Sequence, residues 1–349
     1  MLKFSGYFLI VILVLGVLIF IHELGHFLTA RACGVTVKEF AIGMGPKIFS
    51  RESKKHKTVY TIRLFPIGGF VSMENEDGLD EAAQPDDAGA FVNKSVPKRM
   101  LITAAGAIMN LLLGFVLMMI VVFSTQNLGS TVIREFADNA ASAEKLMVND
   151  EITKIGNTRV HTWNELAYEI MNQGYEPVDV TVIRGGEKIR IEDVSFGTFE
   201  DQGIVFGDYD FRPYAEESTF VNLVKHTFWR SVSTVKMVID SLVGLISGRF
   251  GVDAVSGPIG VVGAVENIGV KDVMSFLYIV CVLTMNLGVF NLIPFPALDG
   301  GRLIFLAIEG VRKKPLDRKI EAYVNFFGLM ILFALMIFIT FKDIFNLIF

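Results

Sequence analysis

The 349-residue sequence predicts a polytopic α-helical membrane protein with about four transmembrane helices, a membrane-associated β-hairpin and an inserted β-rich domain. Apolar residues make up 52% of the chain, above the roughly 45–50% of soluble proteins, and they gather in long runs. Four runs are long enough to cross a bilayer, namely residues 7–29, 100–124, 274–294 and 322–348. A central stretch instead alternates short β-branched runs with turn residues, which is typical of a small folded domain.

Composition excludes several classes of protein. The formal net charge of −5 gives no support to nucleic-acid binding, which favours a basic face. Only Cys33 and Cys281 are present, so neither a disulfide framework nor a zinc finger is expected. A cleavable signal peptide over residues 1–30 is the alternative to a first span, but no small-residue cleavage site follows the apolar run.

The first apolar run carries the motif His22-Glu23-Leu24-Gly25-His26. Histidines four residues apart lie on one face of a helix, so both can bind one zinc ion, with Glu23 beside the ion as a general base. From His22 to Arg31 the helix rises roughly 13 Å, so the motif lies well inside a hydrocarbon layer about 30 Å thick. Ionisable residues at such depth are costly and usually functional. The competing interpretation is a helix whose two histidines and glutamate are paired for structural reasons.

A β-hairpin is predicted between the first two spans. Residues 58–64 alternate and are rich in β-branched side chains, and the short run 68–73 follows Pro66. Its apolar character suits the membrane boundary, where non-helical backbone must be buried in protein or line a cavity. We expect the hairpin to present a strand edge that captures substrate as an added strand, and Gly69 is a candidate substrate-binding residue.

The second apolar run has Gly106, Asn110 and Gly114 at four-residue spacing. Such a stripe of small residues lets a neighbouring helix approach closely. Asn110 is either an interhelical hydrogen-bonding residue or an active-site donor, and we include it among the candidate substrate-binding residues.

Residues 127–212 read as a separate β-rich domain. Strand-like runs surround two helical stretches, and this predicts a small barrel or sandwich; the runs are 131–133, 151–155, 178–183 and 188–191, and the helical stretches lie near 140–147 and 164–172.

From 219 to 246 apolar residues recur at helical spacing but are interrupted by charges, which predicts an interfacial amphipathic helix. We therefore divide the chain into residues 1–126, 127–212, 213–272 and 273–349.

A catalytic zinc needs three protein ligands and one open position, and the two histidines supply only two. The candidate third ligand is Asp299, in Pro294-Phe295-Pro296-Ala297-Leu298-Asp299-Gly300-Gly301 at the end of the third span. The prolines break the helix, so Asp299 lies on irregular backbone, which membrane depth tolerates only around a protein-lined cavity. The alternative is a simple helix-ending turn in which Asp299 caps the next helix.

The distribution of basic residues orients the spans. Lys and Arg are frequent between the first and second spans and again between the third and fourth, which places both connections in the cytoplasm. Both termini and the central domain are then extracytoplasmic, and the His22–His26 motif lies towards the cytoplasmic side.

Together these motifs resemble those of the bacterial site-2 proteases, which are intramembrane zinc metalloproteases. His22-Glu23-Leu24-Gly25-His26 matches one family motif, and Asn291 to Gly301 has the form NxxPxPxLDGG of the other. Residues 43–47 and 66–71 resemble the family's membrane-associated hairpin, residues 127–212 its extracytoplasmic PDZ domain, and residues 256–260 its SGPxG segment. The single domain is that of the regulator-of-sigma-E protease type.

The resemblance implies that His22, His26 and Asp299 bind Zn²⁺, that Glu23 is the catalytic acid and base, and that Asn291 holds substrate. Pro258, from the SGPxG segment, is a further candidate substrate-binding residue. In the PDZ-like region Asn149-Asp150 stands where relatives often have Gly-Asp, so the domain's fold is implied more firmly than its peptide specificity.

The implied function is hydrolysis of peptide bonds in transmembrane segments of single-span proteins in the bacterial inner membrane. Anti-sigma factors in regulated intramembrane proteolysis and remnant signal peptides are the implied substrates, and an extracytoplasmic protease is a possible earlier-acting partner. A non-catalytic membrane scaffold or chaperone is the alternative, which the presence of Glu23 disfavours. A metal transporter would need a polar path, and apart from Asn110 the second and fourth spans offer only Asn325, Thr340 and Lys342-Asp343.

Overall fold

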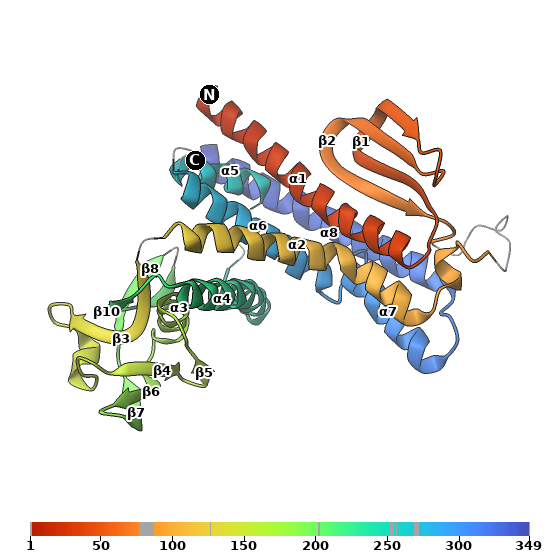
Figure 1. The fold of residues 1–349 in the computed structure, drawn as a ribbon. Coiled ribbons are helices and arrows are strands. Elements are labelled where there is room, and N and C mark those ends of the chain that lie inside the picture. Colours follow the sequence, from red (N-terminus) through yellow and green to blue (C-terminus); the bar gives the residue numbers. More distant parts are fainter. Residues whose placement is uncertain are drawn as a thin grey trace. The chain divides into compact units, whose positions relative to one another are not determined.

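The computed structural model describes residues 2–76, 87–125, 127–201, 203–251, 255, 257–268 and 272–348 (Figure 1). The chain forms two compact units. The first comprises residues 1–114 and 255–349, and the second comprises residues 115–254. The four-part division expected from the sequence stays a prediction.

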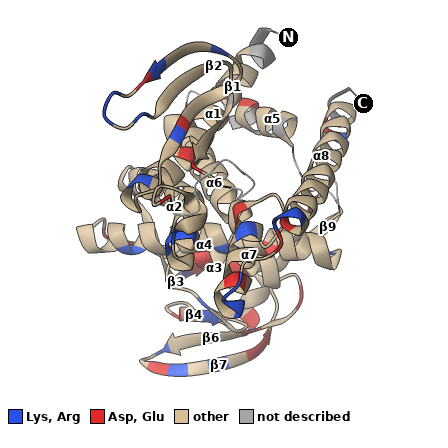
Figure 2. Ribbon diagram, turned by 90° about the vertical axis from the view of Figure 1, so that its right-hand side faces the viewer, with Lys and Arg blue, Asp and Glu red and all other residues tan. Residues whose placement is uncertain are grey.

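Among the described residues, four helices are long and apolar enough to cross a membrane. They are α1 (Leu2–Ala32), α2 (Val96–Phe123), α6 (Val273–Leu292) and α8 (Arg318–Ile348). Their mean hydropathy lies between 2.1 and 2.6, and α8 carries no charge colour over most of its length (Figure 2). These helices coincide with the four predicted runs, so the chain is a polytopic integral membrane protein.

The β-hairpin of the first unit is larger than the sequence predicts. It consists of β1 (Val37–Glu52) and β2 (Val59–Met73), and the register pairs residues 37–42 with 69–73 and residues 47–52 with 59–63. The predicted runs 58–64 and 68–73 therefore both belong to β2 and pair with β1, so the expected pairing of the two runs with each other is wrong. Residue alternation does not reveal β1, because Gly43 and Gly45 interrupt the pattern, and only the family resemblance places residues 43–47 in the hairpin; both glycines have positive φ, which only glycine adopts easily.

A buried apolar cluster holds this hairpin against α1. It includes Phe27 and Ala30 of α1, Val37 and Phe40 of β1, and Ile102 of α2. Phe91, in the short 3₁₀ helix η1 (Phe91–Asn93), is 2% exposed and belongs to the same cluster. Since α1 carries the histidine motif, this packing fixes the hairpin beside it.

The segment after α6 breaks as its prolines predict. α6 ends at Leu292, residues 293–298 are not helical, and α7 (Asp299–Arg312) begins at Asp299. Ala297 has a φ of 71°, in the left-handed region. The remaining helix of the first unit, α5 (Pro258–Ile268), packs through Val262 and Val265 on Val11 of α1.

The second unit contains an antiparallel sheet whose strand order, β10-β3-β4-β6-β7, differs from the order along the chain; β5 also pairs with β4. Its strands are β3 (Leu128–Phe136), β4 (Glu151–Ile155), β5 (Thr158–Arg159), β6 (Val178–Arg184), β7 (Glu187–Val194) and β10 (Phe211–Glu216), and a separate hairpin pairs β8 (Gly197–Asp201) with β9 (Ile204–Asp208). α3 (Trp163–Gln173) contributes Leu166 and Ile170 to a buried core that also includes Ile152 of β4. The helix expected near 140–147 is only a 3₁₀ turn, η2 (Ala141–Glu144).

The predicted amphipathic helix is α4 (Phe220–Ser247), which Thr219 caps by accepting from the Asn222 amide. One face of α4 is exposed and apolar, and its members recur at helical spacing: Val221, Val224, Phe228, Val232, Ile239, Val243 and Ile246. On α4, Lys236 forms an ion pair with Glu169 of α3 at 2.9 Å. The helix thus has one face with buried residues, which contacts α3, and one apolar face that is exposed.

Candidate metal centre

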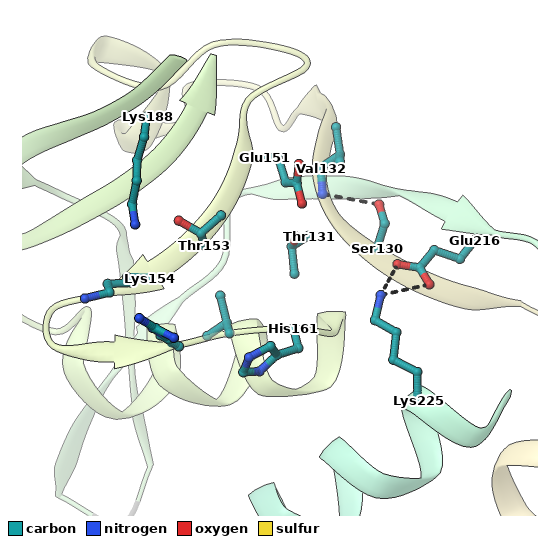
Figure 3. Close-up of a pocket in the computed structure, with 12 residues that line it drawn as sticks. Ser130, Thr131, Val132, Glu151, Thr153, Lys154, His161, Lys188, Glu216 and Lys225 are labelled. Carbon is teal, nitrogen blue, oxygen red and sulfur yellow. Dashed lines mark hydrogen bonds and ion pairs between the residues drawn. The ribbon is translucent and has the colours of Figure 1, made fainter. Parts of the chain in front are cut away.

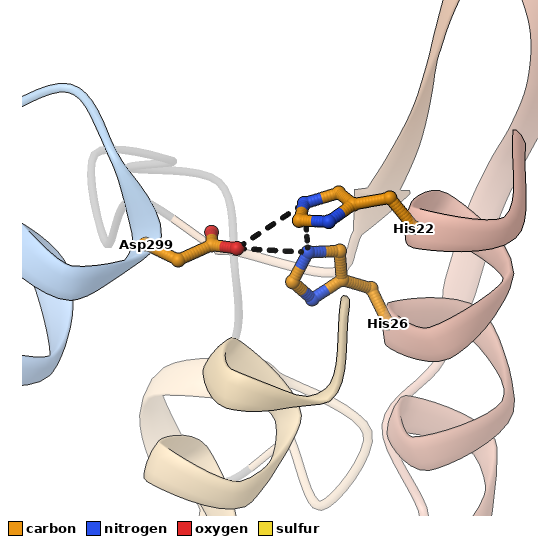
Figure 4. A group of neighbouring side chains, drawn as sticks. All are labelled: His22, His26 and Asp299. Carbon is orange, nitrogen blue, oxygen red and sulfur yellow. Dashed lines mark hydrogen bonds and ion pairs between the residues drawn. The ribbon is translucent and has the colours of Figure 1, made fainter. Parts of the chain in front are cut away.

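His22 and His26 extend from the same face of α1, one turn apart (Figure 4). Their Nε2 atoms lie 3.2 Å apart, and each residue is only 8% exposed. Helical periodicity brings the two rings together, because side chains four residues apart lie one above the other. The motif therefore presents two nitrogen atoms to one point.

Asp299 reaches the same point from α7 (Figure 4). Its Oδ2 lies 3.2 Å from Nε2 of His22 and 3.3 Å from Nε2 of His26. The helix break over residues 293–298 places the first turn of α7 there. Among the described residues, these three form the one cluster with metal-ligand geometry.

The three ligand atoms form a nearly equilateral triangle. In a tetrahedral zinc site with bonds of about 2.0–2.2 Å, two ligand atoms lie about 3.3–3.6 Å apart. The separations of 3.2, 3.2 and 3.3 Å lie within about 0.1 Å of the short end of this range. Asp299 Oδ2 is buried and accepts no hydrogen bond from the described residues, so a cation is the group that would satisfy it. Two imidazoles and a carboxylate suit zinc with a fourth position left open.

α2 supports both histidines. Nδ1–H of His26 donates to the Ile102 carbonyl at 2.8 Å, which leaves its Nε2 unprotonated and free to bind metal. A Cβ atom on Gly106 would lie 2.3 Å from Nε2 of His26 and 2.8 Å from Nε2 of His22. On α1, a Cβ atom on Gly25 would lie 2.4 Å from the Ala105 carbonyl oxygen. The two glycines let the helices approach closely at the metal-binding motif.

A cavity of about 280 Å³ opens beside the ligands. Glu23 lines it together with the two histidines and Asp299, and Asn291 and Arg302 contribute polar groups. The Asn291 side chain donates through Nδ2 to the Leu287 carbonyl at 2.9 Å. The cavity therefore places a carboxylate that could act as a base beside the metal-binding point.

The second half of β2 forms one wall of the cavity. Phe70, Val71 and Met73 line it, and a Cβ atom on Gly69 would lie 3.4 Å from Cγ of Glu23. In the described part of the chain, residues 69–73 pair with β1 along one edge and with no third strand along the other. Residues 59–63 instead face residues 47–52 and also 39–42 of β1. The strand beside the cavity is therefore 69–73.

Two other predicted residues lie elsewhere. Asn110 is 0% exposed and is not part of the cavity wall; its side chain lies beside His22 instead. The backbone of Pro258 begins α5, and its side chain lies outside the described part of the structure.

Sequence reasoning missed two ion pairs around the site. Glu76 and Arg302 both line the cavity and form an ion pair with each other. Arg99 at the start of α2 donates two hydrogen bonds to Glu309 of α7, at 3.0 and 2.5 Å, and ties together the helices on both sides of the metal centre. Arg302 lies three residues after Asp299, on the same face of α7, and that spacing was the available signal.

The second unit has a cavity of its own, of about 310 Å³ (Figure 3). Lys154, Arg159 and Lys188 line it and form no ion pair with a described residue, whereas Lys225 pairs with Glu216 at 3.0 Å. This cavity is polar and rich in positive charge, and the His22–His26–Asp299 cluster is not part of it.

Comparison with known proteins agrees with the metal centre. The chain matches Peptidase family M50 over residues 10–335. It is 35% identical over 339 residues to a protein of Clostridium acetobutylicum named as a zinc metalloprotease, covering 96% of each chain. It is 30% identical over 412 aligned positions to the regulator of sigma-W protease RasP of Bacillus subtilis, covering 95% of this chain and 97% of that protein. It is 31% identical to the zinc metalloprotease RasP of Geobacillus kaustophilus, covering 95% and 96%. With a family match over most of its length, the chain belongs to peptidase family M50, the site-2 proteases, and is a zinc metalloprotease.

Proposed function

We propose that this protein is an intramembrane endopeptidase that hydrolyses peptide bonds within the transmembrane segments of single-span membrane proteins. The observation that carries the proposal is the convergence of His22, His26 and Asp299 beside Glu23 in one cavity, on helices long and apolar enough to span a bilayer. A peptide bond would have to enter the membrane region to reach this cavity.

In this proposal His22, His26 and Asp299 hold zinc. When bound there, zinc would act as a Lewis acid that lowers the pKa of water towards 7 and polarises the scissile carbonyl. Glu23, beside the ligands in the cavity wall, takes a proton from the attacking water and later returns it to the leaving amine. The low exposure of the histidines supports this arrangement, because a dry site strengthens electrostatic interactions.

The substrate would bind as an extended strand along residues 69–73. A transmembrane helix uses its own carbonyls in hydrogen bonds, so it must unwind before cleavage. The edge of residues 69–73 that pairs with no described strand could accept this unwound segment as an added strand, beside the cavity that Phe70, Val71 and Met73 line. Asn291, in the cavity wall, would hold the segment from the other side.

For orientation, we propose that both termini and the second unit are extracytoplasmic and that the metal centre lies towards the cytoplasm of a bacterial inner membrane. Basic residues between the spans support this; the connection between α6 and α8 alone carries Arg302, Arg312, Lys313, Lys314, Arg318 and Lys319. The exposed apolar face of α4 would lie on the bilayer surface.

We further propose that residues 127–212 form a PDZ-like domain that limits which substrates reach the cavity. One relative is named as a regulator of sigma-W protease, which favours an anti-sigma factor as substrate, after a first cut by an extracytoplasmic protease; remnant signal peptides are the second substrate class. The basic cavity formed by Lys154, Arg159 and Lys188 suits the recognition of an acidic chain end.

Reconstitution of the purified protein with a single-span test substrate tests the proposal. We expect wild type to cleave within the span, and Glu23→Gln to bind as much zinc yet lose activity by about 10²–10⁴-fold. Equal cleavage by the two proteins would refute the role of Glu23. Zinc binding with no cleavage of any transmembrane substrate by wild type would favour the scaffold alternative.

A further inference from the structure

We propose that Asn110 is a positioning residue, which holds His22 for zinc by accepting a hydrogen bond from its Nδ1–H. The inference rests on the proposed zinc site and adds a residue to it. It assigns Asn110 a different task from substrate binding, which agrees with its complete burial and its place outside the cavity wall.

The geometry of the ligand triangle fixes the tautomer of His22. Nε2 is the atom that lies 3.2 Å from both Nε2 of His26 and Oδ2 of Asp299. A nitrogen that binds metal carries no proton, so in the zinc-bound protein the proton of a neutral His22 ring is on Nδ1. That N–H group is buried and needs an acceptor.

The side-chain amide of Asn110 lies beside this nitrogen. Its Nδ2 atom lies 3.4 Å from Nδ1 of His22, while its Oδ1 atom is buried without a hydrogen-bond partner in the described part of the chain. With Nδ1 protonated, this orientation would set two donors against each other. The two ends of an amide have nearly the same shape, and the hydrogen-bond network decides between them. Turning the amide by 180° places Oδ1 against Nδ1–H of His22.

The same helix already performs this task for the other histidine. Ile102 accepts from Nδ1–H of His26 through its carbonyl oxygen. Ile102, Gly106 and Asn110 follow one another at four-residue spacing, so one face of α2 supports the whole histidine pair. Thr284 of α6 donates to the backbone carbonyl of Asn110 at 3.3 Å. This hydrogen bond involves Asn110 but neither histidine.

The test compares two substitutions of similar size in the full-length protein. Asn110→Leu keeps the shape but has no acceptor, whereas Asn110→Asp keeps an acceptor oxygen. Zinc affinity is measured by competition with a chromophoric chelator, and loss of such a supporting partner typically weakens metal binding 10–100-fold. Asn110→Ala is a second variant without an acceptor, in case the leucine does not fit. Thr284→Val is the matched control on the neighbouring helix.

We expect Asn110→Leu and Asn110→Ala to bind zinc about 10–100-fold more weakly than wild type, and Asn110→Asp and Thr284→Val to stay within about threefold of it or to bind more tightly. Unchanged affinity in Asn110→Leu and Asn110→Ala would overturn the inference. Equal weakening in Asn110→Asp would also overturn it, because the position would then matter only for packing. A wild type that binds no zinc would instead refute the proposed metal site itself.

Discussion

Adding one methyl group at Gly106 tests the packing of α2 against the metal centre. In Gly106→Ala the new Cβ atom would lie 2.3 Å from Nε2 of His26 and within 2.8 Å of two atoms of His22. Ordinary van der Waals contact begins near 3.4 Å, so the rings or the helix must move by about 1 Å. Metal sites tolerate ligand displacements of only about 0.2 Å, so the triangle cannot keep its geometry. A misplacement of about 1 Å can cost about 100-fold in rate.

We therefore expect Gly106→Ala to bind zinc at least about 100-fold more weakly and to lose cleavage of a transmembrane substrate to a similar degree. Helix propensity alone predicts that this substitution is favourable, since alanine stabilises a helix interior by about 1 kcal/mol relative to glycine. Gly114→Ala is the matched control on the same helix, because there the new Cβ atom would lie 2.4 Å from Cγ of the buried Met285 side chain, a clash of similar size in which the nearest atoms belong to α6 and not to a metal ligand. Wild-type zinc affinity in Gly106→Ala, measured by chelator competition, would refute this reasoning.

Three other predictions follow from contacts of the first unit. Arg99→Leu leaves the partly buried Glu309 without its partner and should destabilise the protein by up to about 3–5 kcal/mol in thermal unfolding, whereas the double variant with Glu309→Leu should recover most of this loss; a fully stable single variant would contradict the role of the ion pair. Two sets of test peptides carry N-methyl groups at either the odd-numbered or the even-numbered backbone positions. One set should be cleaved at least about 10-fold more slowly than the other, because strand pairing has a period of two. Equal cleavage rates for the two sets would count against strand addition at residues 69–73. Asp343 accepts from the amides of Gly257 and Gly260, so Asp343→Ala should speed hydrogen exchange at these amides by about fivefold, from a cap worth about 1 kcal/mol, and unchanged exchange would show that the cap is dispensable.

The convergence of His22, His26 and Asp299 agrees with the sequence analysis because the signals for it are local, whereas their binding of zinc stays a prediction. Helical spacing alone aligns His22 with His26. The prolines before Asp299 predict a non-helical segment, which is tolerated at membrane depth only around a protein-lined cavity. The four spanning helices follow from hydropathy in the same way. Each of these signals depends on residues within about one helix length.

The features that the sequence does not predict depend on contacts between distant residues. Glu76 and Arg302 are 226 positions apart, and Arg99 and Glu309 are 210 apart, so no periodicity links them. Residue alternation does not predict β1, because Gly43 and Gly45 break it, and only the family resemblance points to residues 43–47; the positive φ angles of these glycines are part of how the strand bends. Gly106 is visible as a small residue, but only the fold shows that it faces the two histidines.

The direct test of the metal assignment is X-ray absorption at the zinc edge, on wild type and on Asp299→Ala. We predict two imidazole nitrogens and at least one oxygen at about 2.0–2.2 Å in wild type, and the loss of the carboxylate contribution in the variant. A sulfur ligand, a single imidazole, or an identical spectrum in Asp299→Ala would contradict the assignment of His22, His26 and Asp299 as the zinc ligands.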